Sequence, residues 1–90
     1  MKKLKCPAEV FPPGEFIREE LAARGWTQAT LAAVINRPIQ VVNMIIRGKK
    51  RITARTAHEL AAAFGASPGL WMSLQTTWDL ARLQAGKEQR

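Results

Sequence analysis

Residues 27–48 of this 90-residue chain, TQATLAAVINRPIQVVNMIIRG, carry the clearest signals of local structure. Thr27 is a good helix N-cap, because its side-chain oxygen can accept a hydrogen bond from a backbone N–H that lacks a partner within the helix. A short helix over residues 28–35 is predicted to follow. Asn36 comes directly after it, and asparagine tolerates the left-handed backbone conformation that a tight turn between helices requires. The first half of the stretch is therefore predicted to be a helix that ends in a sharp turn.

A second helix is predicted over residues 38–46. Pro38 suits the first turn of a helix, and Gly48 closes the run. The β-branched residues in this segment favour a strand by propensity alone. The apolar residues nevertheless follow the three-and-four spacing of a helix face, namely Val42, Ile45 and Ile46. Two brief helices joined by so short a turn form a helix-turn-helix, a motif that lays its second helix in the major groove of DNA.

Three further helices are predicted from apolar periodicity bounded by caps, prolines and glycines, over residues 15–24, 54–64 and 68–84. Together with the helix-turn-helix they make one all-α domain of five helices over residues 12–84. Residues 1–11 show no periodicity and are expected to form a mobile arm. Residues 85–90 are expected to be a flexible tail.

Positive charge is concentrated in one window of the chain. The whole sequence has 14 Lys and Arg against 7 Asp and Glu, a net charge of +7. Residues 21–58 contain no acidic residue, and their basic residues are Arg24, Arg37, Arg47, Lys49, Lys50, Arg51 and Arg55. A block so free of counter-charge favours an anionic partner, with nucleic acid as the first candidate and an anionic membrane surface as the second.

Composition excludes several other classes of protein. A hydrophobic content of 47% is typical of a globular domain and too high for a disordered basic tail. One cysteine and one histidine exclude a disulfide framework and argue against a metal site, so we expect no metal and no cofactor. No apolar run approaches the roughly 20 residues that cross a bilayer, and the N-terminus lacks the apolar segment of a secretory signal. We therefore expect a cytoplasmic protein.

Several segments resemble a known family. Two of them resemble the lambda-repressor-like, or XRE-type, helix-turn-helix, namely WTQATLA (26–32) and VVNMIIRGKKRIT (41–53). Three more resemble the HigA antitoxins, also called plasmid-maintenance antidote proteins or virulence-associated protein I, namely PPGEFIREEL (12–21), SPGLWMSLQ (67–75) and WDL (78–80). The resemblance covers about residues 12–83, and its ends are specific to the HigA group.

The resemblance implies a DNA-binding antitoxin of a type II toxin–antitoxin module. Members of the group typically neutralise a HigB-type, RelE-like toxin that cleaves mRNA, and they bind and repress their own operator, usually as homodimers. Two alternatives share the same residues: a stand-alone transcriptional regulator without a toxin, and a module whose basic face meets an acidic protein or lipid surface.

By this resemblance, one residue of the first helix of the motif is expected to contact the DNA backbone, and four residues of the second helix are expected to read bases. Gln28 corresponds to the family's glutamine that contacts the phosphate backbone. Ile39 and Gln40 begin the recognition helix and are expected to reach base edges, with Asn43 and Met44 one turn further on the same face. Gln40 and Asn43 can each pair bidentately with adenine. Ile39 and Met44 depart from the polar or basic residues usual in the family and offer only apolar contact, for example to a thymine methyl.

Basic residues around the motif are expected to contact phosphates at the rim of the interface. They are Arg37, Arg47, Lys49, Lys50 and Arg51. Each of them could alone be a solvated surface charge, and it is their clustering that favours contact with DNA.

Trp71 and Trp78 lie one heptad apart in the last predicted helix. Core packing is the favoured interpretation, and a dimer or partner interface is the alternative, because a small domain rarely needs two large aromatic side chains on one stripe. His58, Ser73 and Thr27 have no pattern of partners that supports nucleophilic or acid–base catalysis, so we expect the protein not to be an enzyme.

Overall fold

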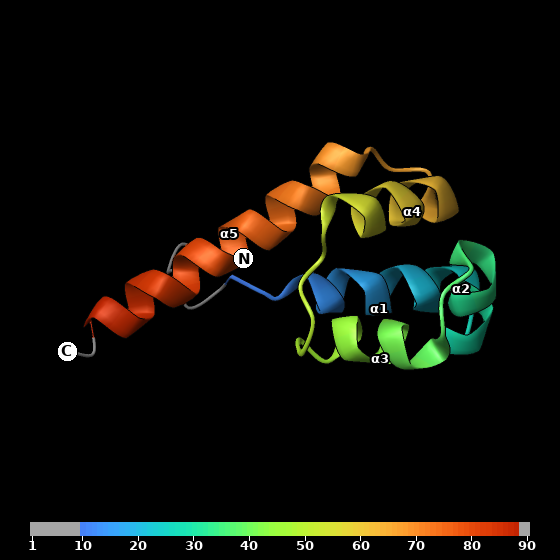
Figure 1. Cartoon of the computed structure of the whole chain (residues 1–90), viewed down its shortest axis with the longest axis horizontal. Coiled ribbons are helices and arrows are strands. Elements are labelled where there is room, and N and C mark those ends of the chain that lie inside the picture. Colours follow the sequence, from blue (N-terminus) through green and yellow to red (C-terminus); the bar gives the residue numbers. More distant parts are fainter. Residues whose placement is uncertain (1–9, 89–90) are drawn as a thin grey trace.

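A computed structural model describes residues 10–88 of the chain. It contains five helices and, within those residues, no strand: α1 Pro13–Arg24, α2 Gln28–Ile35, α3 Ile39–Ile46, α4 Ala54–Phe64 and α5 Pro68–Glu88 (Figure 1). The predicted all-α fold of five helices is confirmed. The prediction of a mobile arm falls largely on residues 1–9, which lie outside the described part of the chain.

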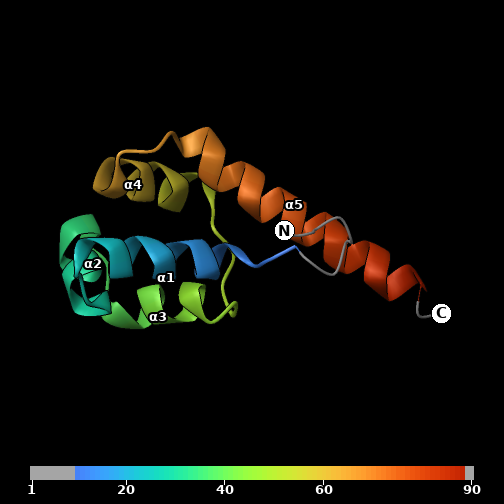
Figure 2. The same cartoon turned by 180° about the vertical axis from the view of Figure 1, so that it is seen from behind.

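The first four helices form the body of the molecule, and α5 projects from it. α3 packs against α1 and α2, and α4 packs against α2 and α5. The start of α5 lies on the body, whereas its second half extends away from the other helices (Figures 1 and 2). The molecule is therefore elongated, with extents of 42 × 28 × 21 Å.

The hydrophobic core draws on every helix and on the segment before α4. Its buried members are Ile17, Leu21, Leu31, Ala32, Ile35, Val42, Ile45, Ile46, Ile52, Ala57, Leu60, Ala61, Phe64 and Trp71. The set includes Val42, Ile45 and Ile46, the apolar face predicted for the helix over residues 38–46. One core therefore joins the helix-turn-helix to the helices on either side of it.

Trp71 belongs to this core. Its side chain is 2% exposed, and its ring centroid lies 5.9 Å from that of Phe64. Core packing is confirmed for Trp71, and its assignment to a dimer or partner interface is wrong, because a buried ring offers no surface to a partner. Trp78 is only half-buried, since α5 has begun to leave the body of the domain by that point.

The predicted helix boundaries follow from side-chain caps. The Thr27 and Thr53 hydroxyl oxygens accept hydrogen bonds from the backbone N–H groups three residues later, at 3.1 and 3.3 Å. Asn36 adopts a φ of 59°, as the turn between α2 and α3 requires. The Ser67 hydroxyl accepts from the Leu70 N–H at 3.2 Å at the start of α5. Pro38 is the N-cap of α3 rather than its first residue, a shift of one position.

The end of α5 differs from the prediction. The helix continues to Glu88, past the expected end at residue 84. The expected tail 85–90 is therefore helical as far as the structure describes it. The physical reason is that this segment contains no proline, and a single glycine lowers helix stability by only about 1 kcal/mol relative to alanine.

α1 and α3 approach each other very closely at Gly14. A Cβ atom at Gly14 would lie 2.2 Å from the backbone oxygen of Ile46, the last residue of α3. Only hydrogen fits in that space. Gly14 therefore sets the distance between the start of α1 and the end of α3.

Replacing Gly14 is expected to destabilise the domain. Gly14→Ala should lower the free energy of unfolding by about 1–3 kcal/mol, because the methyl group must displace backbone rather than a flexible side chain. Gly69→Ala is the matched control, since a Cβ there meets only the Ser67 hydroxyl at 3.9 Å. The control should leave stability unchanged or slightly raised. Urea unfolding measures the free energy of unfolding of both variants. Equal stability of the two variants would contradict the close approach of α1 to α3 at Gly14.

Candidate nucleic-acid interface

The helix-turn-helix is formed by α2, a three-residue turn and α3. The backbone N–H of Arg37 donates to the carbonyl oxygen of Ala32 at 3.0 Å, which closes the end of α2. The axes of α2 and α3 are bent by 117°, within the range of about 90–120° usual for this motif. Within residues 10–88, no single helix is long and apolar enough to cross a membrane, although α2 and α3 together meet that test of length and composition.

α3 has a buried face and an open face. Val42, Ile45 and Ile46 are in the core. On the opposite side Ile39 is 44% exposed and Met44 is 43% exposed. The helix is therefore held by one face, and the other face is available to a partner.

One surface hollow brings together the four residues expected to read bases and the glutamine expected at the phosphate backbone. It is lined by Gln28, Ile39, Gln40, Asn43 and Met44. The side chains of two of them are joined, because the Asn43 Nδ2 donates to the Gln28 Oε1 at 3.1 Å. Gln28 is the first residue of α2, so this hydrogen bond ties the start of one helix to the open face of the other.

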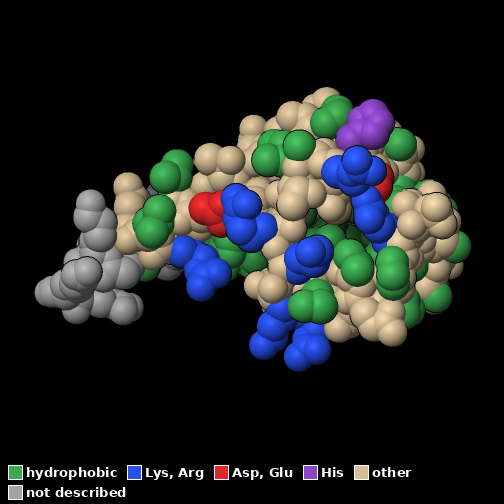
Figure 3. Space-filling model, in the orientation of Figure 1, with side chains coloured by type: hydrophobic (Ala, Val, Ile, Leu, Met, Phe, Trp, Pro, Cys, Tyr) green, Lys and Arg blue, Asp and Glu red, His purple; other side chains and the backbone are tan. Residues whose placement is uncertain are grey.

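Positive side chains lie in the segment that follows α3. Arg47, Lys49 and Lys50 are exposed, and within the described residues none of them is in an ion pair. In Figure 3 Lys and Arg side chains gather around this segment and the neighbouring part of α5, and the acidic groups visible on this face each lie against a basic one. The hollow on α3 is thus followed directly in the chain by residues 47–51, the positive loop.

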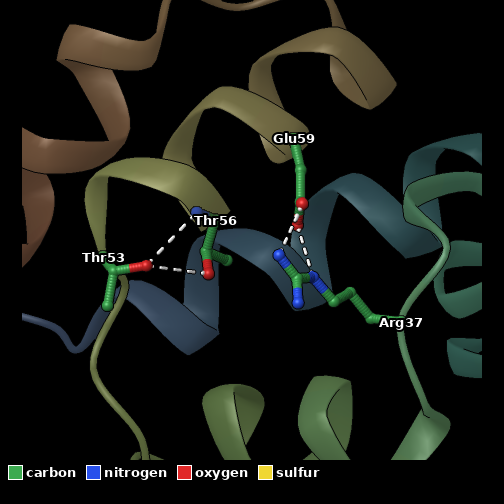
Figure 4. Close-up of polar contacts among 4 residues, drawn as sticks. All are labelled: Arg37, Thr53, Thr56 and Glu59. Carbon is green, nitrogen blue, oxygen red and sulfur yellow. Dashed lines mark hydrogen bonds and ion pairs between the residues drawn. The ribbon is translucent and has the colours of Figure 1, made fainter.

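Arg37 is engaged within the protein. Its Nε donates to the Glu59 Oε1 at 2.9 Å, and its Nη2 donates to the Oε2 at 2.8 Å (Figure 4). Hydrogen bonding to Arg37 lowers the pKa of Glu59, and the same contact raises the pKa of Arg37. Glu59 neutralises the charge of Arg37, and the pair fastens the turn of the motif to α4. The predicted phosphate contact of Arg37 would therefore have to compete with this pair.

A chain of hydrogen bonds fastens the positive loop to α5. Gln75 is 4% exposed, and its Oε1 accepts from the backbone N–H of Ile52 at 2.8 Å. Its Nε2 donates to the Asp79 Oδ1 at 2.9 Å, and the Asp79 Oδ2 accepts from the Arg51 Nη2 at 2.5 Å. Hydrogen bonding from Arg51 is the main reason that the pKa of Asp79 is lowered. The Arg51 side chain stays 63% exposed, so it lies at the edge of the positive surface.

Gln75 and Asp79 were not identified from the sequence. The signal for them was an amide on the same helical stripe as Trp71 and Trp78, followed by a carboxylate one turn later. A polar residue within a buried stripe needs a hydrogen-bond partner, and here the partner is the backbone that enters α4.

Trp78 itself carries the Arg82 guanidinium over its ring, 5.9 Å from the centroid.

Known proteins are similar to this chain in sequence and in fold. A helix-turn-helix family model matches residues 17–71. Virulence-associated protein I of Dichelobacter nodosus is 35% identical over 77 residues, spanning 84% of this chain and 71% of that protein.

Two solved structures have the same architecture. One is the antitoxin HigA of Pseudomonas aeruginosa with the higBA promoter: it is 32% identical, has a TM-score of 0.84, and covers 90% of this chain and 89% of that one. The other is an addiction module antidote protein of the HigA family from Coxiella burnetii: it is 34% identical, has a TM-score of 0.79, and covers 88% of this chain and 89% of that one. The chain therefore belongs to the helix-turn-helix family, in its HigA group of DNA-binding antitoxins with a lambda-repressor-like fold, which are not enzymes.

Proposed function

We propose that this protein is the antitoxin of a type II toxin–antitoxin module, and that it represses its own operon by placing α3 in the major groove of operator DNA. The observation that carries the proposal is the hollow on the open face of α3, which is directly followed by the positive loop. A groove-reading helix needs groups that meet base edges and flanking cations that meet phosphates. DNA as the partner is also supported by the similar antitoxin HigA of Pseudomonas aeruginosa, whose structure was solved with the higBA promoter. Operator DNA also makes the cytoplasm the place of action.

The contacts divide into two classes. Base edges are assigned to Ile39, Gln40, Asn43 and Met44, and phosphates to Gln28, Arg47, Lys49, Lys50 and Arg51. Arg37 leaves the second class because Glu59 holds its guanidinium. The hydrogen bond from Asn43 leaves the Gln28 amide nitrogen available to donate to a phosphate oxygen.

A second copy of this chain is the proposed partner of the projecting half of α5. Leu80 and Leu83 are 56% and 65% exposed there, next to the half-buried Trp78. Apolar side chains on an otherwise solvated helix favour pairing with the same surface of another copy. A homodimer would present two α3 helices to two operator half-sites.

Neutralisation of a HigB-type, RelE-like mRNA-cleaving toxin is the second part of the proposal. It is supported by membership of the HigA group. The acidic residues of the described chain lie outside α2 and α3, in α1, α4 and α5, and of these Glu59 of α4 is already paired with Arg37 of the turn. These helices thus remain available to a basic protein while α3 is on DNA.

Operator binding should depend on salt through the positive loop. Binding of the protein's own promoter is measured by mobility shift over a series of salt concentrations. Lys49→Ala or Lys50→Ala should flatten the slope of log affinity against log salt concentration by about 0.9 per monomer, because a protein with one phosphate contact fewer releases fewer counterions when it binds. Arg18→Ala in α1 removes the same charge from an exposed site that pairs with Glu15, and it should leave the slope unchanged. Equal binding of promoter and scrambled DNA by the wild-type protein would contradict the repressor.

DNA binding and toxin neutralisation should separate in one variant. Gln40→Ala should weaken promoter binding, because it removes an exposed amide from the hollow. The same variant should still restore growth to cells that express the toxin of the neighbouring gene. A wild-type chain that binds its promoter but fails to restore growth would identify a stand-alone regulator instead.

A further inference from the structure

The open face of α3 combines apolar and amide groups without a charge. Ile39 and Met44 are each more than two-fifths exposed, and they share one hollow with the amides of Gln28, Gln40 and Asn43. A single exposed apolar residue needs no explanation, but two around one hollow on a short helix define a surface. No residue that lines this hollow is an arginine or a lysine.

The surroundings of the hollow identify the kind of partner. The nearest charged residues along the chain are all basic, Arg37 before Ile39 and Arg47 after Met44, and residues 21–58 contain no carboxylate side chain. The complementary surface has anionic edges around a centre that offers both hydrogen-bonding groups and an apolar group. The major groove of DNA has this pattern, since phosphates border it and the C5-methyl of thymine is the one apolar group on its floor.

Among the base pairs, the hollow fits A·T best. Asn43 uses one amide hydrogen on Gln28, and its other hydrogen and its oxygen remain for the N7 and N6 positions of adenine. Guanine is most commonly read by arginine or lysine, which the hollow lacks. Adenine pairs with thymine, so an A·T pair can supply both the amide's partner and a methyl group.

We propose that Ile39 and Met44 read thymine methyl groups, and that each operator half-site places A·T pairs against this hollow. The inference rests on the proposed function, because it names the bases that the same surface recognises. Burying one methyl group strengthens binding about fourfold, so two contacts amount to about fifteenfold per monomer.

DNA containing deoxyuridine in place of thymidine tests this directly. The substitution removes the methyl group and leaves every base-pair hydrogen bond in place. The wild-type protein should bind its own promoter at least about tenfold more weakly in the deoxyuridine form. The Ile39→Ala, Met44→Ala double variant should bind the thymidine form more weakly and should lose the difference between the two forms.

Val34→Ala is the matched control. Val34 is 50% exposed on α2 and does not line the hollow. The Val34→Ala protein should therefore bind the deoxyuridine form more weakly than the thymidine form by the same factor as the wild type. Met44→Gln alone keeps a side chain of similar length, and it should reduce the affinity ratio between the thymidine and deoxyuridine forms about fourfold. This single variant serves as a second test if the double variant folds poorly.

The outcomes separate the inference from the function on which it rests. Absence of any preference for the promoter over scrambled DNA would overturn the proposed function. Specific binding that is equal on both forms would overturn the methyl contacts and leave the function standing. A deoxyuridine effect of the same size in the double variant would place the effect in DNA shape and would likewise overturn the inference.

Discussion

The packing of the inner face of α3 into the core holds the helix-turn-helix in its place in the domain. A helix of eight residues is marginal in water by itself, and α3 is rich in β-branched residues that weaken it further. It is stabilised because its inner side chains enter the core and because Gly14 lets α1 approach its last turn. Fixing the inner face also fixes which residues face outward, and those residues form the hollow.

Both ends of α3 are fastened to other helices. Before α3, the Arg37–Glu59 pair joins the turn to α4; after it, Gln75 and Asp79 join the loop to α5. The surface proposed to meet DNA is therefore held in place by contacts within the protein. A surface that is already ordered loses little conformational entropy on binding, so more of its contact energy is available for affinity.

The helices could be predicted from signals between neighbouring residues, whereas side-chain contacts between residues far apart in the sequence could not. The caps at Thr27 and Asn36 and the periodicity of α3 depend on neighbouring residues, which the sequence displays. The partner of Arg37 lies 22 residues away and leaves no trace in spacing. Trp71 and Trp78 share one helical stripe, yet only the first is buried, because burial depends on where α5 leaves the body of the domain.

The open face of α3 and the positive loop are proposed to be the surface that meets operator DNA. Backbone amide chemical shifts of isotope-labelled protein, followed as operator DNA is added, test it most directly. The largest changes are expected at Gln28, in residues 39–44 and in residues 47–50, and the exposed His58 of α4 should be unaffected. Changes concentrated on α4 or on the first half of α5, with α3 unchanged, would contradict it.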